Sequence, residues 1–333
     1  MQKLLSFILF PPDVYVYIAW GVLLLLTAGV WLLCRRRSKH PRRRKWLRWL
    51  PMVPVALGWF VFLWGTYIEF GQLEVVRVDF ASSDLPDAFD GYRIVQFSDA
   101  HVGTYTGCRS DILRRAVDSI NAQHADVVVF TGDLQNKEPE EIAAQKAQLS
   151  RIKARDGIFS VLGNHDYTMY TDLDDPIDIG RNQGNTEGFQ LDLGWQLLKN
   201  SHRYIRRDSS RIVIAGMEND GEPGGRFPQK GDVNAALSGV RRSDFVVMLE
   251  HDPSCWRRKI LPHCHAQLTL SGHTHGGQLQ LMGWSLASLR YREVEGMYYA
   301  GPRALYVSKG LGGVVPFRFG AKPEIVVITL HKK

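Results

Sequence analysis

Two long apolar runs stand at the start of the chain. The first covers 21 uncharged residues, 14–34, and the second covers 20, 49–68. A helix of about 20 apolar residues is long enough to cross the ~30 Å hydrocarbon core of a bilayer. We therefore predict two transmembrane helices, at about 14–34 and 49–68. Pro51, Pro54 and Gly58 leave open a re-entrant or interfacial form of the second segment.

The distribution of charge predicts how these two helices are oriented in the membrane. Ten of the 41 Lys and Arg residues fall in the first 48 positions, against one acid, Asp13. Most of them form the loop 35–48 between the apolar runs, and short basic loops stay cytoplasmic. The sequence thus predicts a multi-pass protein of the cell (inner) membrane. Its anchor is 1–72, and its domain, 73–333, lies on the outer side. A cleaved signal peptide fits less well, because Pro11 and Pro12 interrupt the early apolar stretch.

Beyond residue 73, short apolar runs alternate with polar stretches of helical periodicity. This alternation is typical of an α/β fold. Helices are predicted at 110–123 and 138–153. The segment 167–196 is acidic and rich in Gly and Asn, which indicates an inserted loop or cap. Strands are predicted at 92–97, 127–130, 158–162, 211–215, 245–249, 267–270, 304–307 and 324–330.

The composition of this second part excludes some classes of protein. It holds 31 basic and 33 acidic residues after position 48. Nucleic-acid binding needs a basic stripe within the folded domain, so no nucleic acid is expected as a partner. Four cysteines without Cys-x-x-Cys spacing exclude a disulfide scaffold. Cys255 and Cys264 are either bridged in an oxidising compartment or two unrelated thiols.

Most of the predicted strands in the first three quarters of the domain end in a loop that carries Asp, Asn or His. Ligands of open α/β sheets bind outside the carboxyl ends of the strands, so these loops are expected to converge. Carboxylate and amide oxygens mixed with imidazoles suit Mn²⁺, Fe or Zn²⁺. The set is too large for one ion and fits two ions ~3.5–4 Å apart, a device for attack on phosphorus. It comprises Asp99, His101, Asp133, Asn164, His165, His251, His273 and His275.

These residues carry a family resemblance. Five blocks resemble, in order and spacing, the signature of the calcineurin-like metallophosphoesterases. The blocks are Asp99-x-His101, Gly132-Asp133, Gly163-Asn164-His165-Asp166, His251 and Gly272-His273-x-His275. The tail from Gly310 to Glu324 looks like that of the membrane-associated bacterial branch. The resemblance implies a four-layer αββα sandwich, preceded here by the two transmembrane helices.

The resemblance also implies a role for each site residue. Asp99, His101 and His275 would bind one ion, and Asn164, His251 and His273 the other. Asp133 would bridge the two. His165 and Asp166 would be catalytic, with His165 donating a proton to the leaving oxygen and Asp166 fixing the tautomer of His165. Two divalent ions are expected as cofactors, with Mn²⁺ as the first choice and Zn²⁺ or Fe as alternatives.

The function predicted from these features is hydrolysis of a phosphodiester or pyrophosphate bond by a membrane-anchored, dimetal phosphoesterase. The expected partners are the lipid bilayer and a phosphorylated lipid or lipid-linked nucleotide. The resemblance suggests UDP-2,3-diacylglucosamine of lipid A synthesis. That substrate is made on the cytoplasmic side, which conflicts with an outer domain. The alternatives are an outward-facing phosphodiesterase acting on phospholipids or cell-wall polymers, and a metal-binding scaffold without turnover.

Overall fold

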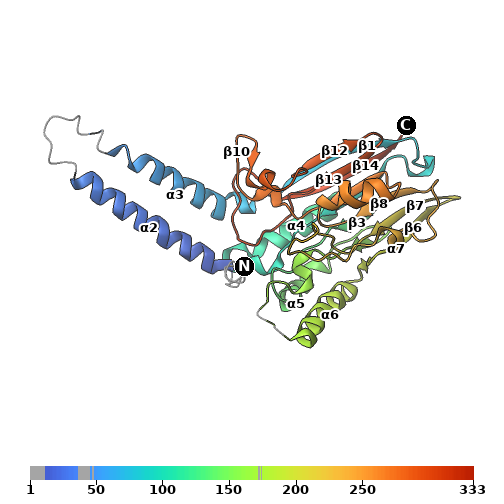
Figure 1. Cartoon of the computed structure of the whole chain (residues 1–333), viewed down its shortest axis with the longest axis horizontal. Helices are drawn as coiled ribbons and strands as arrows, with labels where there is room; N and C mark the ends of the chain where they lie inside the picture. The colour runs from blue at the N-terminus through green and yellow to red at the C-terminus, as the bar shows by residue number, and fades with distance from the viewer. Residues whose placement is uncertain (1–11, 37–45, 47–48, 172, 174) are drawn as a thin grey trace.

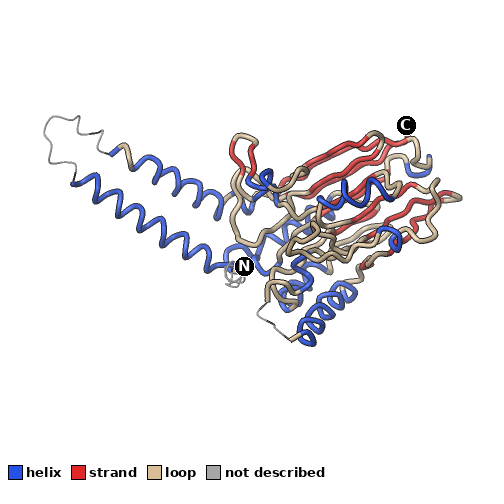
Figure 2. The backbone as a smooth tube through the Cα atoms, viewed as in Figure 1, coloured by secondary structure: helices blue, strands red, loops and turns tan. Residues whose placement is uncertain are grey.

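Two apolar helices project from one end of a layered domain in the computed structural model. It describes residues 12–36, 46, 49–171, 173 and 175–333. Helices α2 (Pro12–Arg36) and α3 (Met52–Tyr67) run side by side in opposite directions (Figures 1 and 2). The helical segments Pro12–Arg35 and Met52–Gly71, the second of which extends α3 through a short 3-10 turn at Glu69–Gly71, are long and apolar enough to cross a membrane. Most of the predicted basic loop between them lies outside the described residues.

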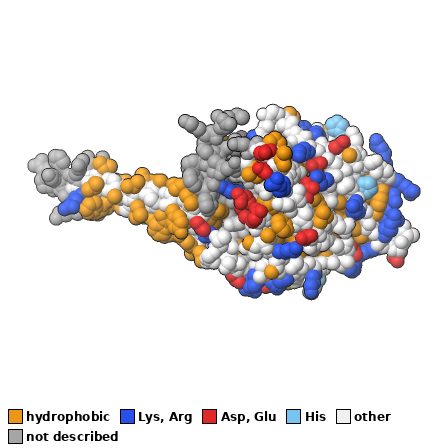
Figure 3. Space-filling model, turned by 90° about the horizontal axis from the view of Figure 1, so that it is seen from below, with side chains coloured by type: hydrophobic (Ala, Val, Ile, Leu, Met, Phe, Trp, Pro, Cys, Tyr) orange, Lys and Arg blue, Asp and Glu red, His pale blue; other side chains and the backbone are white. Residues whose placement is uncertain are grey.

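The second apolar run forms one continuous helix. Pro51 is the residue before the first turn of α3, and Pro54 lies in that turn, where no helical N–H bond is lost. The prolines therefore start the helix and do not break it. Apolar side chains cover the projecting pair, whereas charged side chains of both signs are spread over the domain (Figure 3).

Polar groups on the two helices pair with each other. Trp59 donates its indole N–H to the Thr27 hydroxyl across the pair at 2.9 Å. Trp20 donates in the same way to the Tyr67 hydroxyl at 3.1 Å. The rings of Trp20 and Trp59 also meet edge to face, with their centroids 4.9 Å apart. An apolar medium offers these groups no other partner, so the contacts favour one arrangement of the helices.

The domain is built on two six-stranded sheets. In the first sheet the order is β1-β14-β2-β3-β4-β5, and in the second it is β12-β13-β9-β8-β7-β6. The first contains β1 (Glu74–Ser82), β2 (Tyr92–Phe97), β3 (Val127–Phe130), β4 (Ile158–Ser160), β5 (Gln196–Leu197) and β14 (Glu324–Lys332). The second contains β6 (Ser201–Arg207), β7 (Ser210–Gly216), β8 (Phe245–Leu249), β9 (Leu268–Ser271), β12 (Gly296–Ala300) and β13 (Arg303–Val307).

Most neighbouring strands in these sheets are parallel, so their carboxyl ends share one edge. β2, β3, β4 and β5 pair in parallel, as do β7, β8, β9 and β13. The last strand, β14, lies between β1 and β2, with Glu324 opposite Glu74 and Val327 opposite Val95. A small hairpin of β10 (Gln280–Leu281) and β11 (Trp284–Ser285) stands apart from both sheets.

Apolar packing arranges these elements in four layers. One buried cluster joins the facing sides of the two sheets, including Ile94, Val129, Val247 and Leu268. A second packs the other side of the first sheet against helices, and a third does so for the second sheet. The predicted αββα sandwich is thereby confirmed. The covering helices are α4 (Ser110–Ala122), α5 (Glu140–Leu149) and α6 (Pro176–Asp192), then α7 (Val233–Ala236) and α8 (Leu261–His263), which continues a π-helical turn at Trp256–Ile260.

Several predicted elements need correction. The segment 167–196 is not an irregular cap, because α6 occupies most of it. The Asp175 carboxylate accepts the Ile177 N–H, and Pro176 starts the helix, so local capping overrides the glycine-rich composition. The helix predicted at 138–153 is shorter, beginning after Pro139. Cys255 and Cys264 are both free thiols.

Both helix ends nearest the domain are tied to it. Asp13 of α2 forms an ion pair with Arg109, whose Nε donates to the Thr104 carbonyl at 2.9 Å. At the end of α3, the Gly65 carbonyl accepts the backbone N–H of Arg318 at 3.1 Å. A side chain at position 65 would collide with the Phe317 ring, with the added Cβ only 2.4 Å from it. The close approach therefore depends on glycine.

Candidate metal centre

The predicted site residues meet at the shared edge of the two sheets. The loop after β2 carries Asp99 and His101, the loop after β3 carries Asp133, and the turn at Asn164–Tyr167 follows β4. From the second sheet, His251 follows β8, and His273 and His275 follow β9. Below them, Gln96 of β2 donates across the sheets to the Ser271 carbonyl at 2.9 Å. All of these residues are brought together, as the strand pattern predicts.

An unusual backbone presents these side chains. Five of them adopt left-handed φ angles: Asp99 (49°), His101 (42°), Asp133 (62°), His273 (73°) and His275 (54°). Such conformations are rare for residues with a side chain and cluster at functional sites.

Two pairs of imidazoles flank a central carboxylate. Nε2 of His101 lies 3.2 Å from Nε2 of His275. In the second pair, Nε2 of His251 lies 3.2 Å from Nδ1 of His273. The Asp133 Oδ2 atom lies 3.7 Å from His101 Nε2 and 3.2 Å from His251 Nε2. Asp133 is therefore the residue that reaches both pairs.

Three groups of ligand atoms are compact enough to hold an ion. Within each group the atoms lie within 4.8 Å of one another. Asp133 belongs to two of the groups, which suits a carboxylate shared by two ions. The groups are Asp99, His101 and His275; His101, Asp133 and His165; and Asp133, His251 and His273.

Neighbouring groups leave the right atoms available to a metal. Nδ1 of His251 lies 2.7 Å from the Thr131 carbonyl, which keeps Nε2 unprotonated in the neutral ring. The Asn164 amide donates to the Tyr170 hydroxyl at 3.0 Å. Its Oδ1 atom is buried without a hydrogen-bond partner among the described residues. A buried, unpartnered oxygen is costly unless a cation takes it, so the site fits the expected ions.

Burial sets the protonation states of the histidines. It lowers the pKa values of His101, His273 and His275 well below 6.5. These rings are thus neutral near pH 7, which is the form that binds metals. Burial would also lower the pKa of His251, but the carboxylate of Asp133 outweighs it and raises that pKa to about 10.

The two carboxylates of the centre differ in their acidity. Burial raises the pKa of Asp99 to about 6. Burial acts in the same direction on Asp133, yet attraction to His251 and His165 outweighs it and holds the pKa of Asp133 well below 3.8. Asp133 is therefore ionised near neutral pH, as a bridging ligand must be.

The predicted contact between Asp166 and the His165 ring is wrong. Nδ1 of His165 lies 2.6 Å from the Asn136 carbonyl, so this backbone oxygen sets the orientation of the ring. The Asp166 carboxylate instead accepts four backbone N–H groups, from Asp133, Leu134, Gln135 and Gly163, at 2.9–3.3 Å. Asp166 is next to His165 in the sequence, but its carboxylate does not pair with the His165 ring. It accepts N–H groups from the loops after β3 and β4 and so holds these two loops together.

The strand-end pattern does not reveal other residues of the site. The Tyr291 hydroxyl lies 2.7 Å from Nε2 of His273, and the ring of Tyr170 stacks on His165 with centroids 4.0 Å apart. Phe227 meets His273 edge to face at 4.8 Å. Arg226 and Arg290 lie over the Phe227 ring, with Cζ 4.9 and 5.3 Å from its centroid. All come from loops without a local motif.

The site combines a shared carboxylate, two pairs of imidazoles and an adjacent pair of arginines. This combination is typical of one class of protein, the metal-dependent phosphoric ester hydrolases. Comparison with known families agrees with this result. The calcineurin-like phosphoesterase family model matches residues 92–277, and the chain belongs to this family. Members of the family depend on two metal ions.

Relatives extend the likeness beyond the family model. An uncharacterized metallophosphoesterase of Bacillus subtilis, YkuE, is 32% identical over 79% of this chain and 87% of its own length. A zebrafish protein described as a transmembrane protein with metallophosphoesterase domain is 32% identical over 78% of this chain, which spans 57% of that protein. UDP-2,3-diacylglucosamine pyrophosphatase LpxG of Chlamydia muridarum is 25% identical over 82% of this chain and 94% of its own length. With the two apolar helices, these likenesses indicate a membrane protein.

Proposed function

We propose that this chain hydrolyses a phosphodiester or pyrophosphate bond in a lipid-linked substrate while anchored in the cell (inner) membrane. The observation that carries the proposal is the position of the candidate metal centre beside the apolar helices. Arg109, which pairs with Asp13 of α2, follows His101 by eight residues. Arg318, which is tied to α3, donates to the carbonyl of His275 at 3.4 Å. A lipid-borne phosphate could thus reach the centre without leaving the membrane surface.

The ligand roles in this proposal are those that the family resemblance implies, and the compact groups of ligand atoms support them. Asp99, His101 and His275 would hold one ion, and Asn164, His251 and His273 the other, with Asp133 shared. Mn²⁺ is the proposed metal, with Zn²⁺ or Fe as alternatives, because the donors are oxygen and imidazole nitrogen without thiolate. When bound, such ions supply charge that polarises a phosphoryl group and lowers the pKa of water.

His165 is the proposed proton donor to the leaving oxygen. The Asn136 carbonyl accepts the Nδ1–H of the ring, so the proton to be transferred is the one that Nε2 carries when the ring is an imidazolium ion. Tyr170 stacks on the ring and limits its rotation. Asp166 is a positioning residue in this scheme, because it acts through the backbone of Asp133 and Gly163.

A pyrophosphate is the favoured substrate because of the arginine pair beside His273. Arg226 and Arg290 are both exposed, and neither forms an ion pair with another described residue. Two guanidinium groups beside the second histidine pair suit a second phosphate next to the one being cleaved. The chlamydial relative is named for such a substrate, UDP-2,3-diacylglucosamine.

The charge of the helix connection favours a second candidate. A basic loop at 35–48 on the cytoplasmic side would put the domain on the outer side. An outward-facing domain would not meet a cytoplasmic nucleotide lipid. The same centre would then act as a phosphodiesterase on envelope phospholipids or cell-wall polymers.

Two substrates distinguish these candidates. Purified, Mn²⁺-loaded full-length protein is given UDP-2,3-diacylglucosamine or bis-p-nitrophenyl phosphate, with Asp133→Asn as the blank. We expect release of UMP and 2,3-diacylglucosamine 1-phosphate, lost in the variant. Hydrolysis of the model diester alone would favour the outward-facing candidate. A reporter fused after Lys333 then decides the topology: activity in the cytoplasm only would exclude an outer domain.

A further inference from the structure

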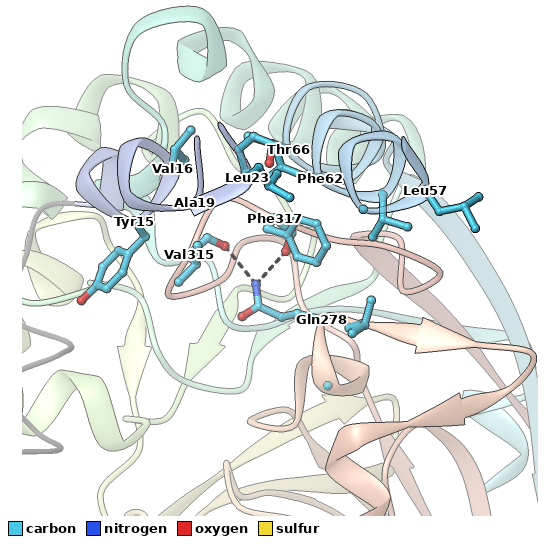
Figure 4. A pocket seen from close by; sticks show the side chains of 14 residues that line it. Tyr15, Val16, Ala19, Leu23, Leu57, Phe62, Thr66, Gln278, Val315 and Phe317 are labelled. Carbon is cyan, nitrogen blue, oxygen red and sulfur yellow. Dashed lines mark hydrogen bonds between the residues drawn. The ribbon is translucent and has the colours of Figure 1, made fainter. Parts of the chain in front are cut away.

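An apolar pocket lies where the projecting helices meet the domain. Its volume is about 640 Å³, which is within the ~300–1,000 Å³ typical of small-molecule sites. Side chains of α2 and α3 form one wall and domain loops form the other (Figure 4). Its apolar lining includes Ala19, Leu23, Val61, Phe62, Val315 and Phe317.

The domain wall of this pocket continues into the metal centre. Gly277 and Gln278 line it and follow His275 by two and three residues. Gln278 donates its side-chain amide to the carbonyls of Val315 and Phe317 at 3.0 and 2.9 Å, which joins the two loops of the wall (Figure 4). One loop thus carries a proposed metal ligand at one end and the pocket wall at the other.

Exposed apolar side chains follow the pocket residues along the chain. The tip of the β10–β11 hairpin begins two residues after the pocket residue Leu279. At that tip Met282 is 99% exposed, Leu281 62% and Trp284 51%. Exposed apolar side chains that include a tryptophan suit burial among lipid head groups. The pocket would then open into the bilayer and not into water.

We infer that the pocket between α2, α3 and the Gln278 and Phe317 loops binds an acyl chain of the phospholipid or nucleotide-lipid substrate. The inference rests on the proposed function and deepens it. The apolar lining excludes a charged ligand, and a hydrocarbon chain is the apolar ligand that a membrane supplies. With the chain in the pocket, the phosphate would lie at the His101 and His275 side of the centre, and the polar end would extend towards Arg226 and Arg290.

Glycines of the two helices provide matched variants. Gly58 lines the pocket, and a Cβ there meets only Leu23, at 3.6 Å, so Gly58→Phe would introduce a ring at the pocket wall without a clash at Cβ. A Cβ at Gly29 meets nothing within 4 Å. Gly29→Phe is therefore the control, because it makes the same change on the lipid-facing side of α2.

The first readout is catalytic. Gly58→Phe should lower kcat/KM for UDP-2,3-diacylglucosamine at least tenfold, mostly through KM, and leave bis-p-nitrophenyl phosphate within about twofold. The Gly29→Phe protein should match wild type on both. Equal losses on both substrates, or no loss on the lipid, would overturn the inference.

The second readout needs no turnover, so it separates failure of the pocket from failure of the proposed function. Protein in phosphatidylglycerol nanodiscs is labelled with a phosphatidylglycerol that carries a diazirine at the end of one acyl chain. We expect cross-links in the peptide containing Val315 and Phe317, retained in Gly29→Phe and lost in Gly58→Phe. Labelling confined to exposed helix faces, or unchanged in Gly58→Phe, would overturn the pocket even if the lipid is hydrolysed. Cross-links without hydrolysis of the nucleotide lipid would keep the pocket and reject that substrate.

Discussion

Nδ1 of His165 lies 2.6 Å from the backbone carbonyl oxygen of Asn136. Because this partner is a backbone atom, a substitution at position 136 removes it only if the backbone moves. The neutral ring is therefore held as the Nδ1–H tautomer, and Nε2 is the atom that gains and loses a proton. This arrangement makes the proposed role of His165 testable through the leaving group.

Replacing His165 with alanine should reduce kcat most where the leaving oxygen needs a proton. We expect a loss of about 10²–10⁴-fold for a diester with an alkoxide leaving group. The loss should be much smaller for p-nitrophenolate, which leaves without protonation. His263→Ala is the control, because His263 is exposed and bonds only its own helix. Equal losses for both leaving groups would contradict the assigned role.

Asp166→Asn should act on stability before it acts on chemistry. The amide group would face two of the four N–H donors that the carboxylate now accepts, which costs about 2–4 kcal/mol of unfolding free energy. Thermal unfolding should therefore shift down, while the pH optimum of the folded fraction stays in place. Asp178→Asn on α6, whose carboxylate makes a surface ion pair with Arg181, should change neither. A stable Asp166→Asn protein with a shifted pH profile would restore a direct role towards His165.

Binding of Mn²⁺ should release about one proton per chain near pH 7.5. His251 keeps its proton up to about pH 10 and must lose it to become a ligand. Affinity should therefore rise roughly tenfold per pH unit between pH 7 and 9, because one proton competes with the ion. Below about pH 6, protonation of Asp99 adds a second competing proton, so the slope steepens. Titration calorimetry in buffers of different ionisation enthalpy measures this count, and a value near zero would mean that His251 is already neutral.

The arginine pair should discriminate between substrates. Arg226→Ala and Arg290→Ala should each lower kcat/KM for UDP-2,3-diacylglucosamine by about 10–100-fold, since a hydrogen bond to a charged group contributes ~1.5–3 kcal/mol. Hydrolysis of bis-p-nitrophenyl phosphate should fall no more than about threefold. Arg292→Ala is the control, because Arg292 is 76% exposed and faces Glu293. A parallel fall on both substrates would assign the arginines to the fold and not to the second phosphate.

How far the sequence predicts the fold depends on which force fixes each element. β2, β3 and β8 have the predicted bounds. β3 and β8 are buried at every residue, and strands buried on both faces need continuous apolar runs. The pattern misses β6, an edge strand with Arg203 and Arg206 exposed, because sheet pairing and not composition holds it. It also misses α6, whose three glycines at positions 180, 184 and 188 face open space and leave no apolar stripe.

Only some of the residues of the candidate site could be predicted from the sequence. Residues placed directly after strands could be predicted, since parallel strands deliver their ends to one edge. Tyr291, Arg226 and Arg290 could not, because long irregular loops bring them to His273. The orientation of Asp166 was also beyond the sequence: nothing in the order of residues shows that its carboxylate faces backbone N–H groups and not its neighbour's ring.

The two contacts between the helices and the domain couple the helices to the proposed ligand loops. Gly65 of α3 bonds to the backbone of Arg318, which contacts the His275 loop, and Asp13 of α2 pairs with Arg109, which contacts the His101 loop. Each of these two loops is therefore supported by one helix. A protease that cut the chain after Gly71 would remove both supports at once. The freed domain would keep its sheets but lose the bracing of two proposed ligand loops. The geometry of both proposed ligand loops is thus coupled to the presence of the two helices.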